Sequence, residues 1–109
     1  MATRCVQSMA MTKTYPIAHI HEQGQDLIII PLEENFMNMR SEAERNGIRD
    51  ALQFFATDAG LKGTVCLVWQ SHKVFRAVAP KVWSSFFESI DMTFVGANLN
   101  RTLTCDYSQ

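Results

Sequence analysis

The sequence predicts an α+β fold, a two-layer sandwich with a mostly antiparallel sheet and two helices on one face. Residues 63–69 (GTVCLVW) are mostly apolar and include two valines, which is typical of a buried strand. Residues 41–59 and 80–90 carry apolar side chains at helical spacing. Each helical segment follows two strand-like segments, so the expected order of elements is ββαββαβ(β), with the last strand optional.

Length and composition indicate a single globular domain. The chain has 109 residues, of which 47% are hydrophobic and 19% charged, with a formal net charge of −1. We expect residues 1–14 to be a flexible N-terminal arm and residues 15–109 to be one α+β domain. The charge balance lacks the basic field of nonspecific nucleic-acid binding, and no segment has the ~20 apolar residues that span a bilayer. We therefore expect no nucleic acid and no membrane among the partners.

The cysteine pattern favours a reducing compartment. Cys5, Cys66 and Cys105 are odd in number and far apart, and no CxxC pair occurs. Cys66 lies inside the strand-like segment, where a thiol usually behaves as a small hydrophobic side chain. A disulfide framework is not expected, and the sequence predicts a cytoplasmic protein.

The first half of the domain reads as a hairpin followed by a helix. Residues 15–21 and 26–30 flank a short polar link that contains glycine, and the second of these strands is apolar on both faces. Pro31 ends that strand because it lacks a backbone donor. Residues 32–40 are expected to be a connection.

Residues 41–59 form the best-marked helix. Ser41 and Glu44 have the spacing of a capping box at its start. Gly60 suits the left-handed position after the helix, and Leu61 can fold back as its apolar contact. The apolar stripe of this helix consists of Ile48, Ala51, Leu52, Phe55 and Ala59.

The second half repeats this order. Residues 64–70 and 73–78 predict a hairpin with its tip at Ser71-His72, and Pro80 suits the first turn of a second helix. Residues 92–97 are expected to be a strand, and residues 98–104 a turn with a short edge strand. An alternative reads residues 74–90 as mainly helical, which would give a flavodoxin-like or STAS-like α/β layer.

A charge asymmetry predicts the candidate site. Between Asp58 and Glu88 the chain has several basic residues and no acidic one. Arg76 and Lys81 are expected near the start of the second helix, where a small anionic ligand could bind; the competing interpretation is a solvated basic face. Trp69 ends a strand, and its indole N–H can reach a partner. The predicted ligand-binding residues are therefore Arg76, Lys81 and Trp69.

Two further functions stay open at this stage. His19 and His21 lie on one strand face, a spacing that can serve a metal ion if further ligands are recruited; the competing interpretation is a pair of histidines at the rim of the sheet. A small enzyme could use Arg76 and Lys81 to hold an anion and His72 or His19 to move a proton. No nucleophile elbow, glycine-rich phosphate loop or paired acid and base occurs, so no catalytic residue, metal or cofactor is predicted.

The second half of the chain resembles small uncharacterised bacterial proteins of the integron gene cassette type. The resemblance covers residues 48–105 and implies no catalytic residue. It rests on Gly60-Leu61-x-Gly63-Thr64-Val65, Val68-Trp69, Ala79-Pro80-x-x-Trp83-x-x-Phe86-Phe87 and Ala97-Asn98-x-Asn100.

The sequence as a whole favours a noncatalytic module that binds a small ligand or a protein. A short chain with 10% aromatic residues and sheet edges that need cover also predicts a homodimer.

Overall fold

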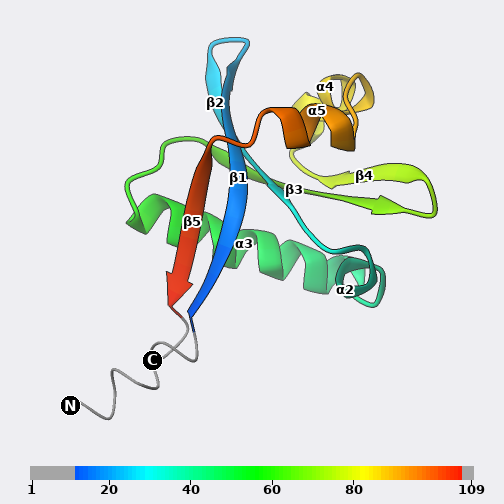
Figure 1. The fold of residues 1–109 in the computed structure, drawn as a ribbon, viewed down its shortest axis with the longest axis horizontal. Coiled ribbons are helices and arrows are strands. Elements are labelled where there is room, and N and C mark those ends of the chain that lie inside the picture. Colours follow the sequence, from blue (N-terminus) through cyan, green and yellow to red (C-terminus); the bar gives the residue numbers. More distant parts are fainter. Residues whose placement is uncertain (1–11, 107–109) are drawn as a thin grey trace.

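The computed structural model describes residues 12–106, in which five strands form one open sheet (Figure 1). The strand order is β4-β3-β2-β1-β5. Three of the four pairings are antiparallel, and β2 and β3 are parallel. This arrangement confirms the α+β class and the mostly antiparallel sheet. The strands are β1 (Thr12–Glu22), β2 (Gln25–Pro31), β3 (Thr64–Ser71), β4 (Val74–Val78) and β5 (Arg101–Asp106).

Helices connect β2 to β3 and β4 to β5. In Figure 1, α3 passes behind β1 and β5, and α4 and α5 lie at the upper end of the sheet. Within the described residues, no helix combines the length and the apolar character needed to cross a membrane. The helices are α2 (Glu34–Asn38), α3 (Glu42–Asp58), the short 3₁₀ helix η1 (Lys81–Trp83), α4 (Ser84–Glu88) and α5 (Met92–Ala97).

Both ends of α3 are built as predicted. Ser41 Oγ accepts from the Glu44 N–H at 3.1 Å, and the Glu44 carboxylate accepts from the Ser41 N–H at 2.8 Å. This is the complete capping box. After the helix, Gly60 has φ +84°, and the N–H groups of Gly60 and Leu61 bond to carbonyls of the last turn. This Schellman motif turns the chain sharply back into β3.

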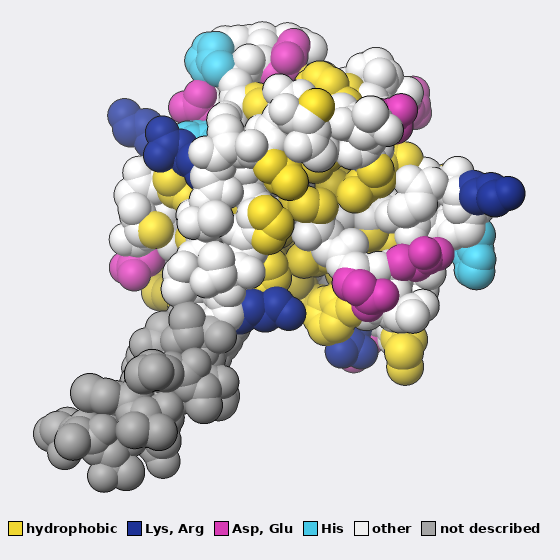
Figure 2. All heavy atoms as spheres, in the orientation of Figure 1, with side chains coloured by type: hydrophobic (Ala, Val, Ile, Leu, Met, Phe, Trp, Pro, Cys, Tyr) yellow, Lys and Arg dark blue, Asp and Glu magenta, His cyan; other side chains and the backbone are white. Residues whose placement is uncertain are grey.

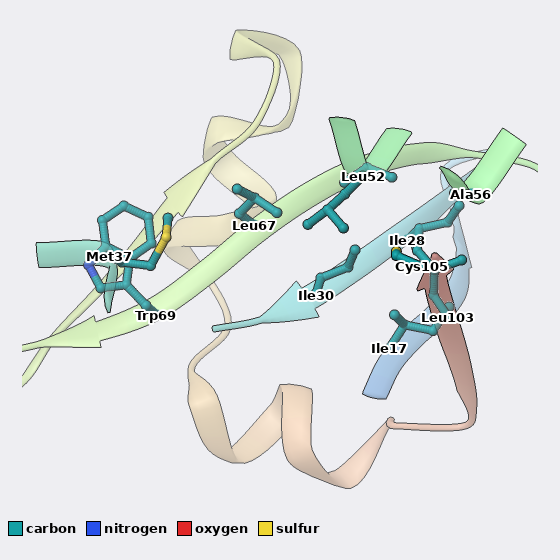
Figure 3. Packing of buried hydrophobic residues seen from close by; sticks show 11 residues of the cluster. Ile17, Ile28, Ile30, Met37, Leu52, Ala56, Leu67, Trp69, Leu103 and Cys105 are labelled. Carbon is teal, nitrogen blue, oxygen red and sulfur yellow. The ribbon is translucent and has the colours of Figure 1, made fainter. Parts of the chain in front are cut away.

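The core has two parts, one on each face of the sheet. Ile28 and Ile30 point toward Leu52 and other side chains on the α3 side (Figure 3). Leu27 and Ile29 point to the opposite face, where they join Trp83, Phe87 and Val95 from η1, α4 and α5. The prediction that both helical regions cover one face is therefore wrong.

Two further predictions are corrected. Residues 92–97 form α5 and not a strand, because the Asp91 carboxylate caps the segment by accepting from the Phe94 N–H at 2.9 Å. The predicted second helix is divided into η1 and α4. The STAS-like alternative is also wrong for this part of the chain, since Val74–Val78 is a strand.

The first residues of β1 belong to the segment that the sequence predicts to be an arm. Most of the predicted arm, residues 1–14, lies outside the described residues, but residues 12–14 are part of β1 and pair with β5. The expected edge strand near residues 98–104 is confirmed as β5, at one border of the described sheet.

Candidate functional site

Trp69 is the centre of the candidate site. It lies in β3, is 2% exposed, and packs beside Met37 of α2 (Figure 3). Its indole N–H donates to Asn38 Oδ1 at 3.2 Å, so the polar atom of the ring already has an intramolecular partner. The ring thus forms a fixed wall of the site, and a ligand would contact the side chains around the ring and not the indole N–H.

Two arginines lie over this ring. The guanidinium carbon of Arg45, from α3, is 5.0 Å from the ring centroid, and that of Arg76, from β4, is 5.7 Å away. Arg76 stands directly opposite Trp69 in the β3–β4 register. Such cation–π contacts contribute about 0.5–1 kcal/mol at exposed sites. They hold two positive charges over one aromatic surface.

Neither arginine is neutralised within residues 12–106. The ion pairs of this part of the chain join His21 to Asp26 and Arg49 to Asp50. Arg45 donates through Nε to the Met37 carbonyl at 3.0 Å, which fixes its orientation and leaves the rest of its guanidinium available. The site therefore carries a net positive charge.

An open hollow of about 400 Å³ lies between α3 and β4, and we call it the Trp69 groove. Its volume is within the range of small-ligand sites. Arginine side chains and an amide supply donors, while one carboxylate limits the excess positive charge. The groove is lined by Glu42, Arg45, Asn46, Trp69, Arg76, Ala77, Val78 and Ala79.

The structure brings together two of the three predicted ligand-binding residues. Trp69 and Arg76 both line the groove, whereas Lys81 is exposed at the start of η1 and is not part of its lining. Arg45 takes the place expected for Lys81. The sequence carried a signal for Arg45, since it stands three residues before Ile48 and seven before Leu52, on the helix face that turns to the sheet.

The two histidines of β1 have separate partners. His19 donates through Nε2 to the Lys62 carbonyl at 2.8 Å, and His21 donates through Nδ1 to Asp26 at 2.8 Å. This hydrogen bond holds the pKa of Asp26 below its ordinary value of 3.8. Within the described chain, no three side chains of the metal-binding types form a cluster that could hold an ion.

The remaining sequence-predicted groups lie outside the groove. His72 is exposed in the β3–β4 turn, where its backbone N–H donates to Glu34. Trp83 is a core residue, 4% exposed. Cys66 is buried in β3, and burial raises the pKa of its thiol to about 12, so it is protonated and inert at neutral pH.

Comparisons with protein families, with curated proteins and with solved structures found no match for this chain. The resemblance to integron cassette proteins therefore stays a prediction.

Proposed function

We propose that this protein is a noncatalytic binding module that holds a carboxylate group of its ligand in the Trp69 groove. One observation carries the proposal: two unpaired guanidinium groups, from Arg45 and Arg76, lie over one buried indole at the wall of an open hollow. Guanidinium groups bind carboxylates through paired, charge-assisted hydrogen bonds.

The lining of the groove favours binding over chemistry. The described side chains around it include one carboxylate, that of Glu42, and no histidine, cysteine or serine with which it could form a catalytic pair. Arg45 is held by its bond to Met37, and Trp69 by its bond to Asn38. Side chains that are already oriented lose little entropy when a ligand binds.

Titration with sodium succinate, followed by two-dimensional ¹H–¹⁵N NMR, tests the proposal. The indole N–H signal of Trp69 should shift with added succinate, while that of Trp83 in the opposite core should not. The Arg45→Gln and Arg76→Gln variants should each lose the response. Arg40→Gln is the matched control, because Arg40 lies over Phe36 at 4.5 Å, outside the groove. An unchanged Trp69 signal at saturating succinate would refute carboxylate binding.

We also propose that the protein acts in the cytoplasm as a homodimer. The buried free thiol of Cys66 supports a reducing compartment. The dimer is supported by β5, a border strand of the described sheet, because an uncovered sheet border can pair with the same strand of a second copy.

A further inference from the structure

Strand β4 is the border of the described sheet next to the Trp69 groove. It pairs with β3 on one side, from Ser71 opposite Val74 to Leu67 opposite Val78. In the part of the chain that the structure describes, no strand pairs with its other side. A border strand with free backbone groups is a template for an added strand.

The turn geometry identifies which backbone groups are free. His72 and Lys73 both have positive φ, 50° and 71°, so they form a two-residue hairpin turn of the I′ kind. Ser71 and Val74, which flank this turn, then exchange both of their hydrogen bonds. Because hydrogen-bonded and non-hydrogen-bonded pairs alternate along two antiparallel strands, the backbone groups of Arg76 also bond to β3. The N–H and C=O groups of Phe75 and Ala77 face away from β3.

The contacts of β3 beyond the end of β4 support this alternation. Val65 is two residues before Leu67, so its backbone groups should point to the β4 side. There they bond to α3 side chains, with the Val65 N–H donating to Gln53 at 2.8 Å and Arg49 donating to the Val65 carbonyl at 2.9 Å.

Both faces of the sheet are hollowed beside this border. On the α3 face lies the Trp69 groove. On the opposite face, where hydrophobic side chains gather below α4 and α5 (Figure 2), a second hollow of about 330 Å³ lies between β4 and α4. We call it the Phe75 hollow, and it is lined by Phe75, Ala77, Ala79, Pro80, Ser84, Phe87, Glu88 and Ile90.

A strand added to β4 would place its side chains in these two hollows alternately, because successive side chains of a strand point to opposite faces. The residue opposite Arg76 lies on the face of the Trp69 groove, where two guanidinium groups favour a carboxylate. Its two neighbours, opposite Phe75 and Ala77, lie over the mainly apolar Phe75 hollow. The complementary pattern is therefore apolar–acidic–apolar.

A second copy of β4 does not fit this pattern. In the antiparallel pairing that bonds the outward N–H and C=O groups of both Phe75 and Ala77, Phe75 lies opposite Ala77 of the second copy. It then sets Arg76 directly opposite Arg76, and like charges in opposite positions are destabilising. The charge of the border favours a different chain.

We infer that β4 binds an extended segment of another protein as an added strand, with a glutamate or aspartate opposite Arg76 and apolar residues on either side of it. This inference rests on the proposed function, since it identifies the carboxylate in the Trp69 groove as a side chain of that segment. Backbone pairing supplies affinity, and the two hollows supply specificity.

The test uses a synthetic peptide, acetyl-Lys-Thr-Val-Glu-Val-Thr-Lys-amide, and two N-methylated forms of it. One form is methylated at both valines and the other at the glutamate and both threonines, so each removes one alternate set of backbone donors. The parent peptide should shift the amide signals of Phe75 and Ala77. One methylated form should bind at least about tenfold more weakly and the other like the parent, because only one set of donors faces β4.

A charge exchange tests the side-chain part of the inference. Arg76→Glu should weaken binding of the glutamate peptide and strengthen binding of the same peptide with lysine in place of the glutamate. Arg76 is exposed, so this variant should fold. Arg40→Glu, outside the groove, is the matched control and should bind both peptides like the wild type.

The outcomes separate the two proposals. If succinate shifts the indole signal of Trp69 but the two methylated peptides bind with the same affinity as each other, strand addition is wrong and carboxylate binding stands. If neither succinate nor peptide binds, both proposals are wrong. If the Phe75 and Ala77 signals change with protein concentration and without peptide, a second copy occupies the border and the inference is overturned.

Discussion

The Gln53 side chain of α3 binds the backbone of Val65 on the side of β3 that β4 does not reach. The Val65 N–H donates to the Gln53 side-chain oxygen at 2.8 Å, and the amide nitrogen of Gln53 donates to the Gly63 carbonyl at 3.1 Å. Because β4 ends at Val78, opposite Leu67, no strand within residues 12–106 pairs with the first residues of β3 on that side. One side chain thus anchors α3 to the start of the buried strand.

Gln53→Leu should destabilise the protein by about 1–3 kcal/mol. Leucine has a similar size, but it leaves the Val65 N–H without its acceptor, and a buried unsatisfied group carries this cost. Urea unfolding followed by circular dichroism measures it. Asn46→Ala, at an exposed position of the same helix, is the control and should change stability by less than about 0.5 kcal/mol. Equal effects of the two substitutions would contradict the role given to Gln53.

Gly63 and Gly47 should respond in opposite directions to alanine. At Gly63, φ is +132° and a Cβ would lie 2.7 Å from the Asp26 carbonyl oxygen in β2, so Gly63→Ala should cost more than about 1 kcal/mol. At Gly47, exposed in α3, a Cβ meets no atom within 4 Å. Gly47→Ala should therefore stabilise the helix by about 0.5–1 kcal/mol. Thermal unfolding of both variants checks the pair, and destabilisation by Gly47→Ala would show that this part of α3 needs glycine.

Asp26 should make the stability sensitive to acid. Its pKa is lowered in the folded protein, chiefly by the hydrogen bond from His21. A carboxyl whose folded pKa is depressed contributes stability above its unfolded pKa, near 3.8, and loses it as the pH falls through the folded value. Urea unfolding at pH 6 and pH 3 should show that the free energy of unfolding falls less between these pH values for Asp26→Asn than for the wild type. An identical loss in both proteins would mean that the His21–Asp26 pair makes no difference in solution.

The sequence already contained the reason why the helices lie on opposite faces. Leu27–Ile30 and Val65–Trp69 are buried at every position, and a strand that is apolar on both sides needs cover on both sides. The α+β class, the cap of α3 and its Schellman end were predictable because each depends on local residues. Residues 92–97 were not, since a short apolar segment fits a helix and a strand about equally well.

The candidate site depends on the position of the hairpin tip, because moving the tip by one residue changes the partner of Trp69 by two residues. A hairpin tip at Ser71-His72 would have placed Trp69 opposite Val74. The observed tip is His72-Lys73, where two non-glycine residues take positive φ, and this shift brings Arg76 opposite Trp69. Neither residue is a usual choice for such a turn, so the register could not be predicted from sequence. Arg45 reaches the same ring only because α3 crosses the sheet there.

We expect the proposed homodimer to form through β5 and not through β4. On a sizing column with light scattering, we expect a particle of twice the 12.4 kDa chain mass. Thr104 is exposed on β5, and antiparallel pairing of residues 102–106 in two β5 strands would place it directly opposite its own copy. Thr104→Lys should therefore dissociate the dimer by like-charge repulsion, whereas Phe54→Lys, on the exposed face of α3, should leave it intact. A 12.4 kDa particle at high concentration would refute the dimer, and dissociation by Phe54→Lys alone would place the interface on α3.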